Sequence, residues 1–112
     1  MSTTPPAPAS GAGDDGEPTS EAGRFQRAAR AGDVDAMVRF GALLTECEPV
    51  STDYFVEGLA WLRAAAAAGH AEGQYLYALA LWRYEEPEQA REWLRRAAEQ
   101  GFAAARAWVE PP

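Results

Sequence analysis

The segment WLRAAAAAGHAEGQYLYALAL, from Trp61 to Leu81, decides the fold. It predicts the end of one amphipathic helix, a reversal at Gly69 and a second helix, because apolar residues recur at helical spacing on both sides of the glycine. A related segment, WLRRAAEQGFAAARAWV, begins at Trp93, and a weaker one, FQRAARAGDVDAMVRFGALL, begins at Phe25. A helical hairpin that occurs three times predicts an all-α fold of stacked hairpins.

The three segments align on their reversal glycines, Gly32, Gly69 and Gly101, which follow one another at intervals of 37 and 32 residues. Each glycine is preceded by a large apolar residue and an Ala-Ala pair, and is followed by a small residue and then an apolar or aromatic one. In chain order these positions are Phe25, Ala28, Ala29, Ala36 and Phe40; Leu62, Ala65, Ala66, Gly73 and Tyr77; and Leu94, Ala97, Ala98, Ala105 and Val109. Such a pattern is expected when each unit buries its face on the next. The sequence therefore predicts an α-α superhelix, a short solenoid of three hairpins.

Capping and turn signals place the starts of the expected helices near Glu21, Asp33, Thr52, His70, Pro87 and Phe102. Opposite charges four residues apart predict pairs on the exposed helix faces. These pairs are Asp35 with Arg39, Glu92 with Arg96, and Arg95 with Glu99. Gly58 and Gly73 stand inside expected helices, where glycine costs about 1 kcal/mol of helix propensity.

Residues 1–22 are rich in Pro, Ala, Gly, Ser, Thr and acid, with no large apolar residue after Met1. They are expected to form a disordered tail, because they cannot bury enough surface to offset chain entropy. Residues 23–112 form the expected helical-repeat domain. A net charge of −7 argues against a nucleic-acid or anionic-membrane partner. With one cysteine, Cys47, and neither a secretory signal nor a membrane span, we expect a cytoplasmic protein.

The repeated phrase resembles the SEL-like repeat, a helical hairpin related to the tetratricopeptide repeat. Residues 93–101, WLRRAAEQG, match the family's phrase almost position for position, and residues 61–69 match it with alanines in the polar positions. The resemblance covers roughly residues 24–109. It implies an α-solenoid that acts as an adaptor in protein complexes. The Arg-only, Ala-rich composition is typical of a GC-rich bacterial genome.

The sequence contains no constellation that indicates catalysis, a cofactor or a metal. A lone histidine, His70, does not make a metal site, and it follows a reversal glycine, where it is expected to start a helix. Cys47 lies between Glu46 and Glu48, which disfavour a reactive thiolate. The acidic cluster at residues 85–88 is typical of a helix amino terminus.

The alternative to a catalytic function is a binding surface. In tetratricopeptide-type stacks the first helix of each hairpin lines the concave face, and the resemblance implies the same here. The candidate partner-binding residues are Trp61, Arg63, Trp93, Arg95, Arg96 and Trp108. Arg and Trp are enriched in binding hot spots, and Arg can bind carboxylates, so an acidic peptide is the expected ligand. The competing interpretation places both Trp61 and Trp93 in the core and the arginines on solvated faces.

The last hairpin predicts a second surface. It is expected to expose Phe102, Trp108 and Val109 with little polar covering, which favours self-association or docking on a partner. The sequence as a whole favours a non-catalytic protein–protein interaction module that binds a protein or peptide. A regulatory or accessory subunit of a larger enzyme complex is the main alternative, and a binder of small ligands on the concave aromatic surface is a third.

Overall fold

The computed structural model describes residues 20–46, 52–84 and 86–109, and all regular secondary structure in these ranges is helical. The helices are α1 (Glu21–Arg30), α2 (Val34–Glu46), α3 (Thr52–Ala67), α4 (Ala71–Arg83), α5 (Pro87–Glu99) and α6 (Ala103–Val109). The predicted all-α class is confirmed. Residues 1–19 of the predicted tail, and Cys47, lie outside the described residues.

Each predicted reversal glycine has a backbone conformation that only glycine adopts readily. The φ angles are 101° at Gly32, 92° at Gly69 and 88° at Gly101. In all three hairpins the amide after the glycine donates to the carbonyl five residues earlier, for example from His70 to Ala65 at 3.1 Å. This bond is the hallmark of the Schellman helix end, so the three reversals are built in the same way.

Two of the second helices begin with a side-chain cap. The Asp33 carboxylate accepts the Ala36 amide at 3.2 Å, and His70 Nδ1 accepts the Gly73 amide at 3.0 Å. Because Nδ1 accepts a hydrogen bond, the proton of the neutral imidazole lies on Nε2, which is 2.6 Å from Asp35 Oδ1. His70 therefore caps α4 and also contacts the first turn of α2, in the preceding hairpin.

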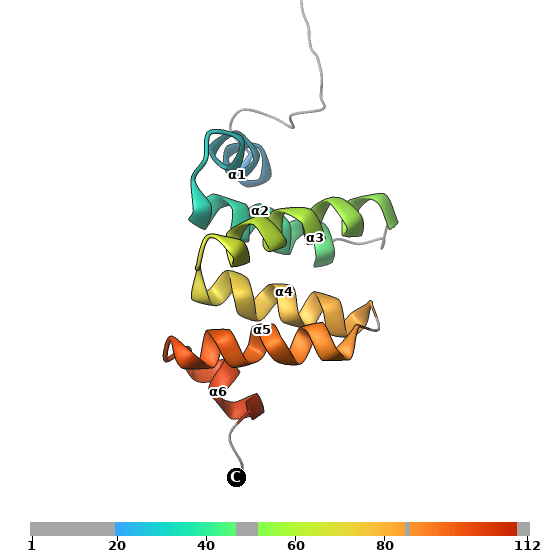
Figure 1. Cartoon of the computed structure of the whole chain (residues 1–112). Helices are drawn as coiled ribbons and strands as arrows, with labels where there is room; N and C mark the ends of the chain where they lie inside the picture. Colours follow the sequence, from blue (N-terminus) through green and yellow to red (C-terminus); the bar gives the residue numbers. More distant parts are fainter. Residues whose placement is uncertain (1–19, 47–51, 85, 110–112) are drawn as a thin grey trace, which may run out of the picture.

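Figure 1 shows the helices stacked in chain order, with α1 at one end of the stack and α6 at the other. Each helix packs against the next along the chain, and α2 also contacts α4. The core lies along this stack, and Val38, Leu62 and Leu94 are its largest fully buried side chains. Two of these, Leu62 and Leu94, occupy the repeat position predicted to carry a large buried residue.

The glycines inside the helices mark the points where helices approach most closely. A Cβ atom on Gly58 would lie 2.8 Å from the carbonyl oxygen of Gly41, and one on Gly73 would lie 2.9 Å from the Ala65 Cβ. Real Cβ atoms do not approach other atoms so closely, so only glycine fits without a shift. The small residues predicted four positions after each reversal, Ala36, Gly73 and Ala105, are all buried.

The predicted ion pair between Asp35 and Arg39 is wrong. The Arg39 guanidinium instead forms a bidentate pair with the Glu72 carboxylate of α4, with N–O distances of 2.6 and 3.2 Å. Asp35 contacts His70. The next hairpin thus brings better-placed partners to both side chains. The two pairs predicted on α5 are confirmed, since Arg96 contacts Glu92 at 3.0 Å and Arg95 contacts Glu99.

Candidate protein-binding surfaces

Successive hairpins meet at two interfaces, which we call seams. Each seam contains an aromatic pair with the same edge-to-face geometry. Phe40 of α2 meets Trp61 of α3 edge to face, with ring centroids 6.1 Å apart and planes at 66°. Tyr77 of α4 meets Trp93 of α5 in the same way, at 5.6 Å and 69°. Both tryptophans are half-buried. Trp61 and Trp93 therefore each join one hairpin to the next.

Two arginines of α5, Arg95 and Arg96, already have carboxylate partners. Arg95 binds Glu92 and Glu99, and Arg96 binds Glu92 while its guanidinium lies 4.6 Å from the centre of the Trp93 ring. Hydrogen bonds from Arg95, and then from Arg96, hold the pKa of the Glu92 carboxyl below its ordinary value. A carboxylate ligand would have to compete with these pairs on the same helix.

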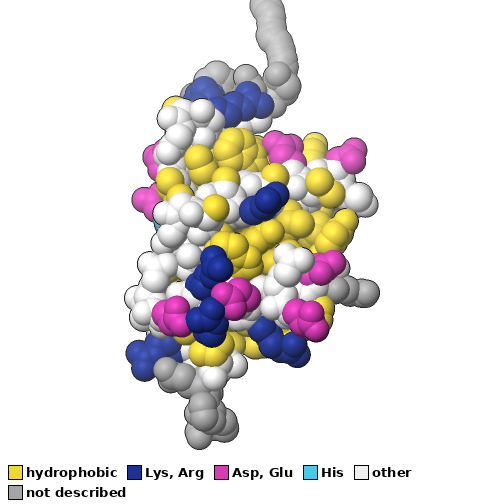
Figure 2. Space-filling model, viewed as in Figure 1, with side chains coloured by type: hydrophobic (Ala, Val, Ile, Leu, Met, Phe, Trp, Pro, Cys, Tyr) yellow, Lys and Arg dark blue, Asp and Glu magenta, His cyan; other side chains and the backbone are white. Residues whose placement is uncertain are grey.

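Arg63 differs from Arg95 and Arg96. It lies exposed on α3 and forms no hydrogen bond or ion pair with the rest of the described chain. Figure 2 shows hydrophobic side chains gathered over the middle of the visible face, with arginines and acidic residues around them. Of the predicted arginines, Arg63 is thus the one available to an acidic ligand without competition.

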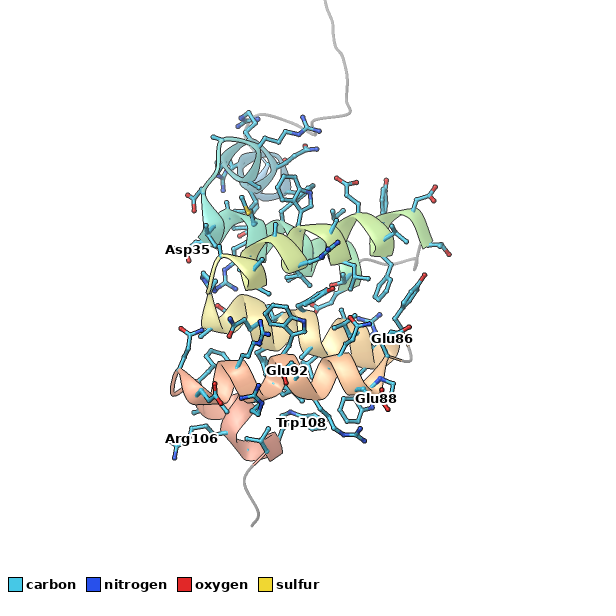
Figure 3. All side chains as sticks on the ribbon, viewed as in Figure 1. Asp35, Glu86, Glu88, Glu92, Arg106 and Trp108 are labelled. Atoms are coloured by element: carbon cyan, nitrogen blue, oxygen red, sulfur yellow. The ribbon has the colours of Figure 1, made fainter. Side chains whose placement is uncertain are left out.

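The carboxyl-terminal end of the stack carries the second surface. A hollow of about 370 Å³ opens there, lined by Trp82, Arg91, Leu94, Arg95, Trp108 and Val109. Trp108 is 52% exposed and Trp82 38% exposed, and their ring centroids lie 5.5 Å apart. Figure 3 shows Trp108 and Arg106 projecting in different directions from α6, with Trp108 beneath α5. We call this feature the α6 hollow.

The structure brings together some of the sequence-predicted residues and separates others. Trp108 and Arg95 both line the α6 hollow, whereas Trp61 and Trp93 belong to successive seams. Phe102 is half-buried against Tyr75, with ring centroids 5.3 Å apart, so its predicted exposure is wrong. The exposure predicted for Trp108 and Val109 is confirmed, at 52% and 42%.

Two residues of the α6 hollow were missed by sequence reasoning. Trp82 follows Gly69 by as many residues as Thr45 follows Gly32, and only Thr45 of this pair is buried. Arg91 lies with its guanidinium 5.5 Å from the centre of the Trp82 ring. In the sequence, the only signal for this surface was a large tryptophan, Trp82, at the repeat position where the preceding unit has the smaller Thr45.

The described ranges hold no group of three or more His, Cys, Asp or Glu side chains placed to bind a metal ion. Within the same residues, no helix combines the length and apolar character that crossing a membrane requires. No family model, curated protein or solved structure matches the chain.

Proposed function

We propose that this chain is a non-catalytic protein-interaction module, a short α-α superhelix of the SEL-like type that binds a protein or peptide partner. One observation carries the proposal: three large apolar side chains, Trp82, Trp108 and Val109, lie exposed around one hollow. Exposed apolar clusters of this kind are typical of protein-binding surfaces, and tryptophan and arginine dominate binding hot spots.

The hairpin stack supports the same proposal. Each hairpin buries its outer face on the next, so the last hairpin has a face that no later hairpin covers in the described chain. The first hairpin differs, because the exposed residues of α1 include Glu21, Arg24, Arg27 and Arg30. One end of the stack is thus charged and the other apolar, and the apolar end is the one suited to a partner.

The test compares partner capture by three forms of the full chain. The wild type, Trp108→Glu and Tyr54→Glu are immobilised and exposed to extract of the native host, and bound proteins are identified by mass spectrometry. Tyr54 is the matched control, because it is an aromatic residue of α3 with 51% exposure, close to the 52% of Trp108. We expect Trp108→Glu to lose partners that the wild type and Tyr54→Glu retain.

Two outcomes would contradict the assignment of the α6 hollow as the binding surface. If Trp108→Glu captures the same proteins as the wild type, the α6 hollow is not the binding surface. If the single substitution Arg63→Glu abolishes capture, the partners bind to the face of α3 and α5 instead. The sequence-based acidic-peptide hypothesis predicts that outcome. Circular dichroism of each variant shows whether the helices are intact, so that loss of capture is not confused with unfolding.

A further inference from the structure

The α6 hollow has a counterpart in the preceding hairpin. That counterpart is a small cavity of about 30 Å³ whose lining includes Thr45, Leu62 and Leu76. Relative to the reversal glycines, these residues stand at the same repeat positions as three residues of the α6 hollow. The matching residues are Trp82, Leu94 and Trp108. The two spaces therefore occupy equivalent places in successive hairpins, but the first is much smaller and less open to solvent.

The second half of α4 fills most of the space in the preceding hairpin. Leu79, Ala80 and Arg83 supply the rest of the lining from α4, which is 13 residues long. Helix α6 is described for only 7 residues and reaches just Val109. Val109 stands at the repeat position of Phe40 and Tyr77, yet it is 42% exposed where they are 6% and 7% exposed. The open volume is thus where two further helical turns lie in the preceding unit.

The side chains that line the α6 hollow indicate which kind of ligand fits there. Trp82, Leu94, Trp108 and Val109 supply apolar surface. Arg91 adds a positive charge that stacks on Trp82 and has no carboxylate partner in the described chain. In the preceding hairpin the aliphatic Leu59 stands at the repeat position of Arg91. A helix with an apolar face and a carboxylate near its edge would satisfy both features.

A second copy of the chain fits this surface poorly. In a head-to-tail stack, the incoming α1 would present Arg24, which stands at the repeat position of Trp61 and Trp93. A second copy stacked in this way would therefore lack the tryptophan that both existing seams between hairpins contain.

We propose that the α6 hollow binds a short amphipathic helix of a partner protein, which completes the last hairpin in trans. The helix carries small and aliphatic residues at the spacing of Leu79 and Ala80 against Trp82 and Trp108, and an acidic residue against Arg91. This inference rests on the proposed function and adds the chemical nature of the partner.

The probe is a pair of stapled helical peptides that copy residues 78–84 of α4, ALALWRY. One keeps the arginine at the position of Arg83, and the other has glutamate there. In α4 the Arg83 guanidinium lies 5.2 Å from the centre of the Phe55 ring, one turn before Leu59 on α3. Because Leu59 corresponds to Arg91, a glutamate at the Arg83 position would lie near Arg91.

Binding to the full chain is measured by fluorescence anisotropy of labelled peptides. We expect the Glu peptide to bind about threefold more tightly than the Arg peptide, as one partly exposed ion pair provides. Trp108→Glu should weaken binding at least about tenfold, as expected for a hot-spot tryptophan, whereas Tyr54→Glu should leave it unchanged. Arg91→Glu should reverse the preference between the two peptides.

Other results overturn the inference in distinguishable ways. Equal binding of both peptides would reject the acidic partner. If neither peptide binds while Trp108→Glu still loses its host partners, the helical occupant is rejected and the proposed function stands. If light scattering shows a dimer that Trp108→Glu dissociates, the occupant is a second copy of the chain. If Trp108→Glu affects neither peptide binding nor capture, both proposals fail.

Discussion

Single residues decide how closely the helices approach. Gly41 and Gly58 face each other across α2 and α3, and a Cβ on Gly58 would also lie 2.7 Å from Thr45 Cγ2. Each glycine weakens its helix by about 1 kcal/mol relative to alanine. The gain is that the two backbones approach closely and surround Leu62, which is 1% exposed. The two glycines thus lower the propensity of each helix but allow closer packing between the hairpins.

We predict that Gly58→Ala destabilises the protein by about 1–3 kcal/mol, because overpacking outweighs the better helix propensity of alanine. Urea unfolding followed by circular dichroism measures the change. The control is Ala64→Gly at an exposed position of the same helix, which should cost about 1 kcal/mol from propensity alone. A Gly58→Ala variant more stable than wild type would show that the helices can separate without loss.

The sequence predicts contacts within a helix better than contacts between helices. The reversal glycines and the Glu92–Arg96 pair were correctly predicted, because each depends on a fixed local spacing. The Asp35–Arg39 pair was wrong, because both side chains have partners in the next hairpin. Which residues of two helices meet depends on how the helices are aligned, and one chain's periodicity does not specify that.

At the scale of elements, the two seams repeat one design. An aromatic residue of the second helix meets a tryptophan of the following first helix, with planes at 66° in one seam and 69° in the other. The surrounding residues differ, since Arg96 stacks on Trp93 while the Trp61 indole nitrogen lies 3.4 Å from Glu57. The shared pair is therefore the feature that sets the packing of successive hairpins.

We predict a coupling free energy of about 1 kcal/mol between Phe40 and Trp61, measured by a double-mutant cycle of leucine substitutions in thermal or urea unfolding. The same cycle on Tyr77 and Trp93 should give a similar value. The control cycle combines Phe40 with Trp93, which lie in different seams and should show no coupling. Equal coupling in all three cycles would mean that the pairs act through the whole stack rather than by direct contact.

The repeat pattern predicts some features of the α6 hollow but not the hollow itself. The repeat predicted that Val109 corresponds to Phe40 and Tyr77, and its exposure follows from the absence of a later hairpin in the described residues. The exposure of Trp108 was also expected. The hollow itself was not, because it depends on Trp82 from the preceding hairpin and on the 7-residue length of α6.

At the scale of the molecule, contacts run mainly between helices that are neighbours along the chain. Helices α3 and α4 each have packed neighbours on both sides, and α4 also contacts α2. The end helices α1 and α6 each pack mainly on one neighbour. In such a linear arrangement, stability is a sum of units and interfaces, so the ends are held least firmly.

We predict that native-state hydrogen exchange follows this order. The amides of α3 and α4 should exchange most slowly, and those of α1 and α6 most rapidly, because local opening of an end helix breaks only one interface. Two-dimensional NMR spectra recorded during exchange measure the rates residue by residue. A single opening free energy shared by all six described helices would show that the stack unfolds as one unit.

The two contacts of the His70 ring affect how one hairpin can twist against the next. One ring nitrogen accepts the Gly73 amide in the first turn of α4, and the other contacts Asp35 in the hairpin before it. The start of a helix and one contact between two hairpins thus share one rigid, planar ring. Twisting one hairpin against the other would strain the first turn of α4, so this joint resists torsion more than a seam held by apolar contacts alone.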